Sequence, residues 1–133
     1  MAVIRDVEIF RVGHWNGDNH SVADLEDMVS AFRHSNIEIP VKIGHAEKNG
    51  IQVFGTVTAV RRVGEKLLAD IDVTSQLYRM IRSHRFDYVS PEVFHDLQRN
   101  GKHYTRALKA IAIVGSETPA VAGLAPLREA IDA

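Results

Sequence analysis

Residues 87–114 read DYVSPEVFHDLQRNGKHYTRALKAIAIV and predict a long β-hairpin. The pair Asn100-Gly101 lies inside this stretch, and Asn-Gly favours the positive backbone angles of a tight turn. The flanking segments Asp87–Leu97 and Lys102–Val114 supply the two strands. Because the second strand ends in the apolar run Ile111–Val114, we expect this end of the hairpin in the interior of a sheet.

Further strands are expected on the amino-terminal side of the hairpin. Val3–Val12 is rich in β-branched and apolar residues and is followed by a glycine, which predicts a first strand. The runs Pro40–His45 and Ile51–Arg62 are separated by Asn49-Gly50 and therefore predict a second antiparallel hairpin. After the next turn, apolar and acidic residues alternate up to Val73, which is typical of a strand with one buried face.

Other segments carry helical patterns. Ser21 followed by Asp24 has the form of a capping box, and apolar residues then recur at helical spacing over Val22–Arg33. Ser75–Ser83 has an apolar stripe on one helical face. Leu124–Ile131 has a proline in its first turn, where the missing backbone donor is not needed. Two or three helices are therefore expected.

These patterns together predict an α+β fold. A mainly antiparallel sheet of about six strands, or a small, partly closed barrel, is flanked by the helices. The chain has 133 residues, which is the size of one domain with one hydrophobic core. We therefore expect a single domain over residues 1–133.

Composition and charge exclude several classes of function. Sixteen basic and seventeen acidic residues give a formal net charge of -1, which lacks the basic excess of a nucleic-acid-binding protein. The chain has no cysteine, so disulfides, thiolate catalysis and zinc–thiolate sites are excluded. No apolar run approaches the roughly twenty residues that span a bilayer. We therefore expect neither a nucleic-acid nor a membrane partner, and no cofactor.

Histidine is the residue type that most suggests chemistry, since the chain contains seven. His45 stands out because it ends an apolar strand where a rigid element meets a loop. The remaining candidates lie in loops or near element ends, where a solvated histidine is the usual case: His14, His20, His34, His84 and His103. His14 and His20 together with Asp18 could supply oxygen and nitrogen ligands to a metal, but their spacing matches no established metal motif.

Ser90 is the preferred nucleophile for an attack assisted by histidine. Strand alternation places it on the same face as Tyr88 and Glu92. Ser116 is the rival, although its neighbours have the composition of a loop. The chain has no Gly-x-Ser-x-Gly elbow, so an α/β-hydrolase is not supported.

A series of short motifs occurs in a fixed order along the chain. They are His45, Gly55-Thr56-Val57, Leu67-Leu68-Ala69-Asp70, Tyr88-Val89-Ser90-Pro91-Glu92, Ala110-Ile111-Ala112-Ile113-Val114 and Pro119-Ala120-Val121. In this order the chain resembles the prohead proteases of tailed bacteriophages, and more narrowly the branch of the Mu-type protease and scaffold proteins. The similarity covers nearly the whole chain, from Val7 to Leu127.

The resemblance implies a fold similar to herpesvirus assemblins, in which a β-barrel is wrapped by helices. It implies a Ser/His catalytic centre in which the histidine precedes the serine, and His45 and Ser90 fill these positions. The implied function is that of a serine endopeptidase of head maturation, which cleaves scaffold protein and itself by acyl transfer. The major capsid protein is a further candidate substrate, a homo-oligomer is left open, and the implied location is the procapsid within the host cytoplasm.

The third member of the catalytic centre is open. Many prohead proteases carry a carboxylate that orients the histidine on the strand before the Pro-Ala motif, and this chain has Ala110 or Lys109 there. Glu92 is the first substitute and Asp96 and Glu117 are alternatives, while a bare Ser/His dyad is another. On strand pattern alone, Glu92 is more simply interpreted as a solvated carboxylate.

Two other functions remain as rival hypotheses. The first is a virion or assembly protein that keeps the protease fold without catalysis, which the missing acid favours. The second is a metal-dependent hydrolase, which requires at least three ligands to converge. No metal is expected in the preferred interpretation.

Overall fold

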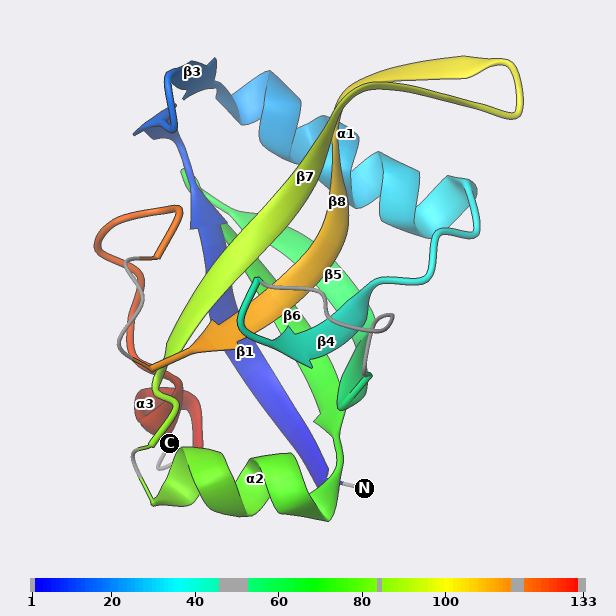
Figure 1. The fold of residues 1–133 in the computed structure, drawn as a ribbon. Helices are drawn as coiled ribbons and strands as arrows, with labels where there is room; N and C mark the ends of the chain where they lie inside the picture. Colours follow the sequence, from blue (N-terminus) through cyan, green and yellow to red (C-terminus); the bar gives the residue numbers. More distant parts are fainter. Residues whose placement is uncertain (1, 46–52, 84, 116–118, 132–133) are drawn as a thin grey trace.

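The computed structural model describes residues 2–45, 53–83, 85–115 and 119–131, and it contains one large sheet with helices around it (Figure 1). The large sheet consists of β1 (Ala2–Arg11), β4 (Pro40–Ile43), β5 (Gly55–Val63), β6 (Lys66–Val73), β7 (Tyr88–Arg99) and β8 (Lys102–Val114). A small second sheet pairs β2 (Gly13–Trp15) with β3 (Asp18–His20). The helices in the described ranges are α1 (Val22–His34), α2 (Ser75–Arg82) and α3 (Leu127–Ile131).

The large sheet is mixed, and its strand order is β1-β6-β5-β4-β8-β7. Neighbouring strands are antiparallel except for β4 and β8, which run parallel from Val41 opposite Ile111 to Ile43 opposite Ile113. The α+β class is confirmed, whereas the antiparallel sheet is correct only in part. The parallel pair joins strands that are far apart in the sequence, so no local turn signal could predict it.

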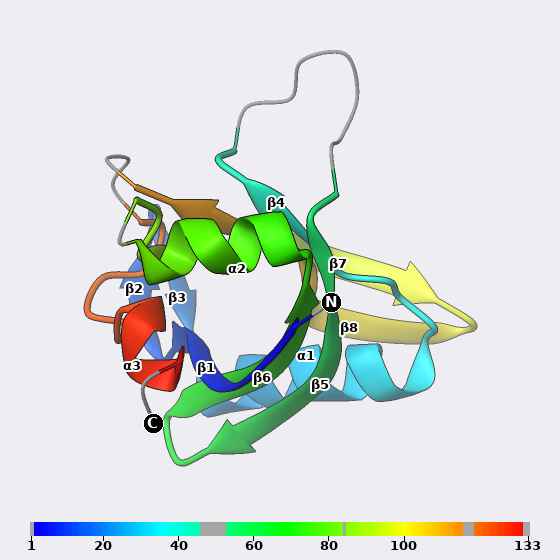
Figure 2. The same cartoon turned by 90° about the horizontal axis from the view of Figure 1, so that it is seen from below.

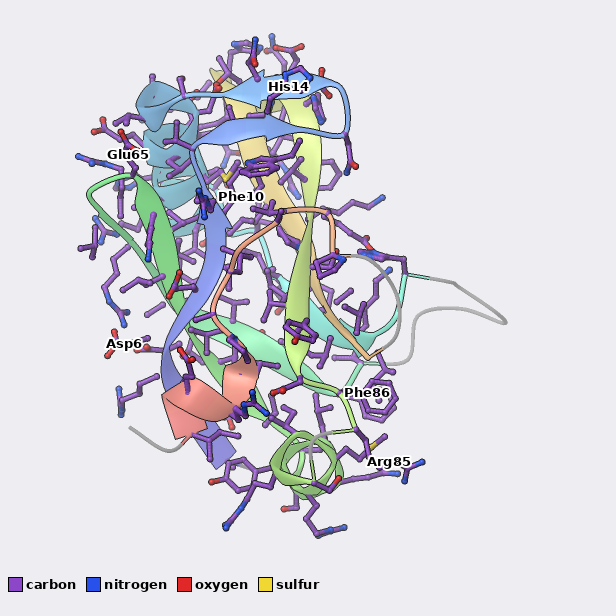
Figure 3. All side chains as sticks on the ribbon, turned by 90° about the vertical axis from the view of Figure 1, so that its left-hand side faces the viewer. Asp6, Phe10, His14, Glu65, Arg85 and Phe86 are labelled. Carbon is purple, nitrogen blue, oxygen red and sulfur yellow. The ribbon has the colours of Figure 1, made fainter. Side chains whose placement is uncertain are left out.

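The alternative of a small, partly closed barrel is wrong, because the sheet of the described residues does not close. In the part of the chain that the structure describes, β1 pairs only with β6 and β7 pairs only with β8, so both remain sheet edges. The carboxy-terminal segment 119–131 lies between these two edges (Figure 3). It is fixed there because the Leu127 amide donates to the carbonyl of Asp87 at 2.7 Å, just before β7, while α3 packs against β1. Segment 119–131 thus occupies the space in which β1 and β7 would have to pair to close the sheet into a barrel.

The helix α1 begins with the predicted capping box. The Ser21 side chain accepts from the Asp24 amide, and the Asp24 carboxylate accepts from the Ser21 amide in return. The helix then packs along β8, with Leu25 and Met28 buried against the sheet. It ends at His34, one residue beyond the predicted range.

The hairpin of β7 and β8 matches its prediction closely. β8 has the predicted bounds, and Asn100 and Gly101 both adopt positive φ angles, of 52° and 75°. β7 starts at Tyr88 and runs to Arg99, slightly beyond the predicted Leu97. The other predicted turn, Asn49-Gly50, lies outside the described residues, although β4 and β5 do pair antiparallel.

The carboxy-terminal helix is shorter than predicted. It begins at Leu127 and not at Leu124, because Pro126 precedes the helix and disfavours helical geometry at the residue before it. The helix α2 covers one end of the sheet (Figure 2) and buries Leu77 and Ile81. Thr74 caps it by accepting from the amide of Leu77.

Candidate active site

His45 lies two residues after the end of β4. Gly44 adopts a φ of 67°, which suits glycine, and its amide donates to the carbonyl of Ile113 at 2.9 Å. This turn ties the chain to the end of β8, beside the strand that carries Ser90. The imidazole of His45 is therefore presented from a rigid sheet end, as the sequence predicted.

Ser90 lies on β7 within hydrogen-bonding distance of His45. The distance between Ser90 Oγ and His45 Nε2 is 2.8 Å. The same Oγ accepts a hydrogen bond from the backbone amide of Ala120, also at 2.8 Å. The structure thus brings the two residues of the predicted pair together, and it adds a backbone donor that the sequence did not indicate.

Glu92 completes a chain of hydrogen bonds. It lies two residues after Ser90 on the same strand, so both side chains emerge on one face. Its Oε2 is 2.6 Å from His45 Nδ1, on the opposite side of the imidazole from Ser90. Ser90, His45 and Glu92 are therefore connected in the order of a nucleophile, a base and an orienting carboxylate.

The other candidates for the third position lie elsewhere or outside the described part. Asp96 is 3.1 Å from His103 on the exposed part of the β7–β8 hairpin. Glu117 and the rival nucleophile Ser116 lie outside the described residues. Glu92 is therefore the candidate carboxylate that the structure places at His45, and its interpretation as a solvated strand residue is wrong.

Glu92 also faces a buried lysine. The Nζ of Lys42 is 2.9 Å from Glu92 Oε2, and it donates to the carbonyl of His45 at 3.4 Å. The Lys42 side chain is only 5% exposed. Sequence reasoning missed this residue, although a lysine inside the apolar run of β4 is a signal, because a buried charge needs a partner.

The charge of Glu92 follows from these contacts. Burial alone would raise the pKa of Glu92, but the hydrogen bonds from His45 and Lys42 and the charge of Lys42 outweigh it. The pKa of Glu92 therefore lies below its ordinary value, and the group is a carboxylate at neutral pH. An ionised partner fixes a proton on His45 Nδ1, which leaves Nε2 able to accept the proton of Ser90.

A cleft of about 500 Å³ opens beside this group. His45, Glu92, Pro91 and Ala120 are among the residues that line it. Ser90 itself has no exposed surface, so its Oγ lies just beneath the cleft wall. The site therefore consists of an open cleft, lined by His45 and Glu92, and of the Ser90 hydroxyl, which is covered beside it.

Ala110, where the resemblance to prohead proteases leads one to look for a carboxylate, lies opposite Glu92. Ala110 is the cross-strand partner of Glu92 in the β7–β8 pair. Side chains at such positions are neighbours, with Cβ atoms about 5 Å apart. Lys109 instead places its Nζ 5.7 Å from the centre of the Phe94 ring. The carboxylate beside His45 thus comes from the strand adjacent to the one on which it was sought.

The remaining histidines do not form a metal site in the described ranges. His14 Nδ1 is 2.7 Å from the side-chain oxygen of Asn19 at the surface, whereas His20 is buried. His34 is exposed at the end of α1, and His84 lies outside the described residues. Among the described residues, no group of three His, Asp or Glu side chains is placed to hold a metal ion.

Comparison of the chain with known proteins identifies no related protein. No family model, no curated protein and no solved structure matches the chain. Within the described part, no helix is both long and apolar enough to span a membrane.

Proposed function

We propose that this chain is a serine endopeptidase that works by acyl transfer. The observation that carries the proposal is the continuous series of hydrogen bonds through Ser90, His45 and Glu92, at 2.8 and 2.6 Å. These distances fall within the range of about 2.6 to 3.2 Å expected of a nucleophile and its base.

The reaction follows from the proton positions. His45 Nε2 takes the proton of Ser90 as Oγ attacks the peptide carbonyl and forms the new C–O bond. The imidazolium then gives this proton to the leaving amine as the C–N bond breaks. A water molecule, deprotonated in the same way, hydrolyses the acyl-enzyme and restores the serine. Glu92 keeps the imidazole oriented and stabilises its positive charge throughout.

The amide of Ala120 is suited to help in the first step. It already donates to Ser90 Oγ, so it lies beside the carbon that Oγ attacks. A backbone donor in such a place stabilises the oxyanion of a tetrahedral intermediate, and loss of one donor costs on the order of a hundredfold or more in rate. Substrate entry must also uncover Ser90, which is fully buried beside this amide.

The biological role that we propose is head maturation in a tailed bacteriophage. The support is the order of motifs from His45 to Pro119-Ala120-Val121, which resembles that of prohead proteases. The expected substrates are scaffold protein, the protease itself and the major capsid protein, cleaved inside the procapsid. The position of Glu92 opposite Ala110 supports this role, because it gives His45 a carboxylate although Ala110 stands where prohead proteases commonly have one.

A second candidate function is a non-catalytic assembly module with the same fold. The complete burial of Ser90 favours it, since a nucleophile must meet its substrate. The two hypotheses differ in one property that is easily measured, which is whether Ser90 reacts.

The deciding experiment combines a reagent and natural substrates. The chain is treated with a fluorophosphonate, and separately incubated with the scaffold and capsid proteins of the same phage, and all masses are read. We expect labelling and cleavage in the wild type and in the Ser83→Ala control, whose serine lies at the exposed end of α2. Ser90→Ala should abolish both. If the folded wild type neither reacts nor cleaves yet assembles with these partners, the non-catalytic function replaces the protease.

A further inference from the structure

A second histidine near the site, His20, has an unsatisfied nitrogen. It ends β3, is 5% exposed, and its Nδ1 has no hydrogen-bond partner among the described residues. Burial, followed by the nearby charge of Arg106, lowers the pKa of His20, so the ring is neutral. A buried polar atom without a partner is costly, and such atoms are rare in folded proteins.

His20 lines a small pocket that continues the cleft of the candidate active site. The pocket measures about 50 Å³ and shares part of its lining with the larger cleft. The shared residues are Asn16, Pro91, Val93, His95 and Ala120. Since the Ala120 amide contacts Ser90 Oγ, a side chain in this pocket would belong to a substrate residue close to the bond under attack.

The walls of the pocket define the group that fits. Phe10 packs its ring edge against His20, with ring centres 5.0 Å apart, and Val93 and Val121 add further apolar surface. Figure 3 shows Phe10 on β1 below the β2–β3 hairpin that carries His14. A volume near 50 Å³ is about a third of the roughly 150 Å³ cavity that holds one benzene molecule, so it has room only for a small side chain. The pocket is thus too small for an aromatic or long side chain.

The free imidazole nitrogen of His20 further limits which substrate side chains fit the pocket. A neutral imidazole nitrogen either donates or accepts, depending on its tautomer, and a hydroxyl group can do either. Serine and threonine have a hydroxyl on a side chain of two or three non-hydrogen atoms, and the methyl group of threonine suits the apolar wall. A carboxylate would suit only a donating nitrogen and would bury a charge.

We infer that the pocket at His20 is a specificity subsite that takes a serine or threonine side chain of the peptide substrate, hydrogen-bonded to His20 Nδ1. This inference rests on the proposed protease function, which it extends to the substrate sequence. His20 contacts no reacting atom, so its part is selection of the substrate and not catalysis.

The test begins with cleavage of a proteome-derived peptide library by the whole chain, with Ser90→Ala as the blank. Sequenced products should show serine and threonine enriched at one fixed position near the cut. Peptides that differ only by threonine or valine at this position then isolate the hydroxyl, since the two side chains have the same shape. We expect kcat/KM to favour threonine by about fivefold or more.

Variants of His20 separate its hydrogen bond from other causes. His20→Phe keeps a ring and removes both nitrogens, and it should bring the threonine-to-valine ratio to within about twofold of one. His20→Leu serves the same purpose if the first variant unfolds, as judged by circular dichroism. His103→Phe, on the distant part of the β7–β8 hairpin, is the matched control and should keep the wild-type ratio.

Each outcome bears on a different claim. Cleavage that depends on Ser90 but does not distinguish threonine from valine overturns the subsite and leaves the protease intact. A preference that persists in a folded His20 variant also overturns the assignment to His20. If wild type and Ser90→Ala both leave the library uncut, the protease proposal itself fails and the subsite fails with it.

Discussion

Lys42 and Glu92 link the stability of the protein to its proposed chemistry. The two groups are 2.9 Å apart and largely shielded from water, and Glu92 also orients His45. An ion pair in such surroundings gains little net free energy, but removing one member takes a close counter-charge away from the other and destabilises the fold. The same substitution can therefore harm folding, catalysis or both, and single variants cannot tell these effects apart.

A double-mutant cycle separates the two roles. Glu92→Gln should lower the free energy of unfolding by about 3 kcal/mol, because Lys42 loses the carboxylate that faces it. It should also reduce peptidase activity on the order of a thousandfold or more, because an amide no longer fixes the tautomer of His45. Glu92→Gln combined with Lys42→Met should recover most of the stability and none of the activity. Urea unfolding and peptide cleavage measure the two quantities.

The opposite pattern would show that Glu92 has only a structural role. If the double variant regained activity along with stability, the loss in Glu92→Gln would come from misfolding of the site. Lys42→Met alone should still cleave, since Glu92 keeps its hydrogen bond to His45.

Only some of the residues of the site could be predicted from the sequence. Ser90 and Glu92 share a face because strand side chains alternate, and this relation was predictable. That His45 reaches both of them depends on the parallel pairing of β4 with β8, which no local pattern encodes. The strand patterns and the resemblance to prohead proteases both indicated His45 and Ser90, whereas Lys42 and the Ala120 amide became visible only in three dimensions.

At the scale of elements, Asp70 holds the bulge that bends β1 against β6. The bulge lies between Ile4 and Val7, and Asp6 there adopts a left-handed φ of 56°. The Asp6 amide and the Arg61 guanidinium both donate to Asp70 Oδ1, each at 3.0 Å. Burial alone would raise the pKa of Asp70, but these hydrogen bonds lower it below its ordinary value.

The lowered pKa predicts how Asp70→Asn depends on pH. Because the folded-state pKa lies below the unfolded one, the carboxylate stabilises the fold above about pH 4, and this contribution is lost as the pH falls through the folded-state pKa. Urea unfolding should therefore show Asp70→Asn less stable by about 1 to 3 kcal/mol at pH 7, with a smaller difference at pH 3. Asp96→Asn, on the exposed part of the hairpin, is the control and should change little at either pH. An equal loss for Asp70→Asn at both values would rule out the charge as the cause.

Elements with strong local signals were predictable, and elements fixed by distant contacts were not. α1 has a capping box and an apolar stripe, and β8 follows an Asn-Gly turn, so their bounds could be predicted closely. β2 and β3 are short and mostly polar, so no alternation marks them. The sequence left a six-stranded sheet and a small barrel as alternatives, because the segment that separates β1 from β7 is an irregular tail, whose docking depends on contacts such as Leu127 with Asp87.

At the scale of the whole molecule, the buried core joins all the major elements. Large buried side chains come from both ends of the chain and from the middle: Ile9, Leu25, Leu67, Leu77, Leu108 and Leu127. The small β2–β3 sheet is tied to this core, because His20 is buried against Phe10 and the Trp15 indole donates to the carbonyl of Arg11 at 2.9 Å. Unfolding of any one of these elements should therefore expose the buried core side chains of the others.

Trp15 makes this cooperativity measurable, since it is the single tryptophan and lies outside the large sheet. We predict that its fluorescence and the far-ultraviolet circular dichroism of the sheet and helices change at the same urea concentration, as in a two-state transition. A fluorescence midpoint at lower urea would show that the β2–β3 sheet opens first. Because Trp15 and His20 both line the small pocket, such early opening would also mean that the proposed subsite is formed only part of the time. The threonine preference would then weaken in step with the Trp15 signal as urea is added, well before the large sheet unfolds.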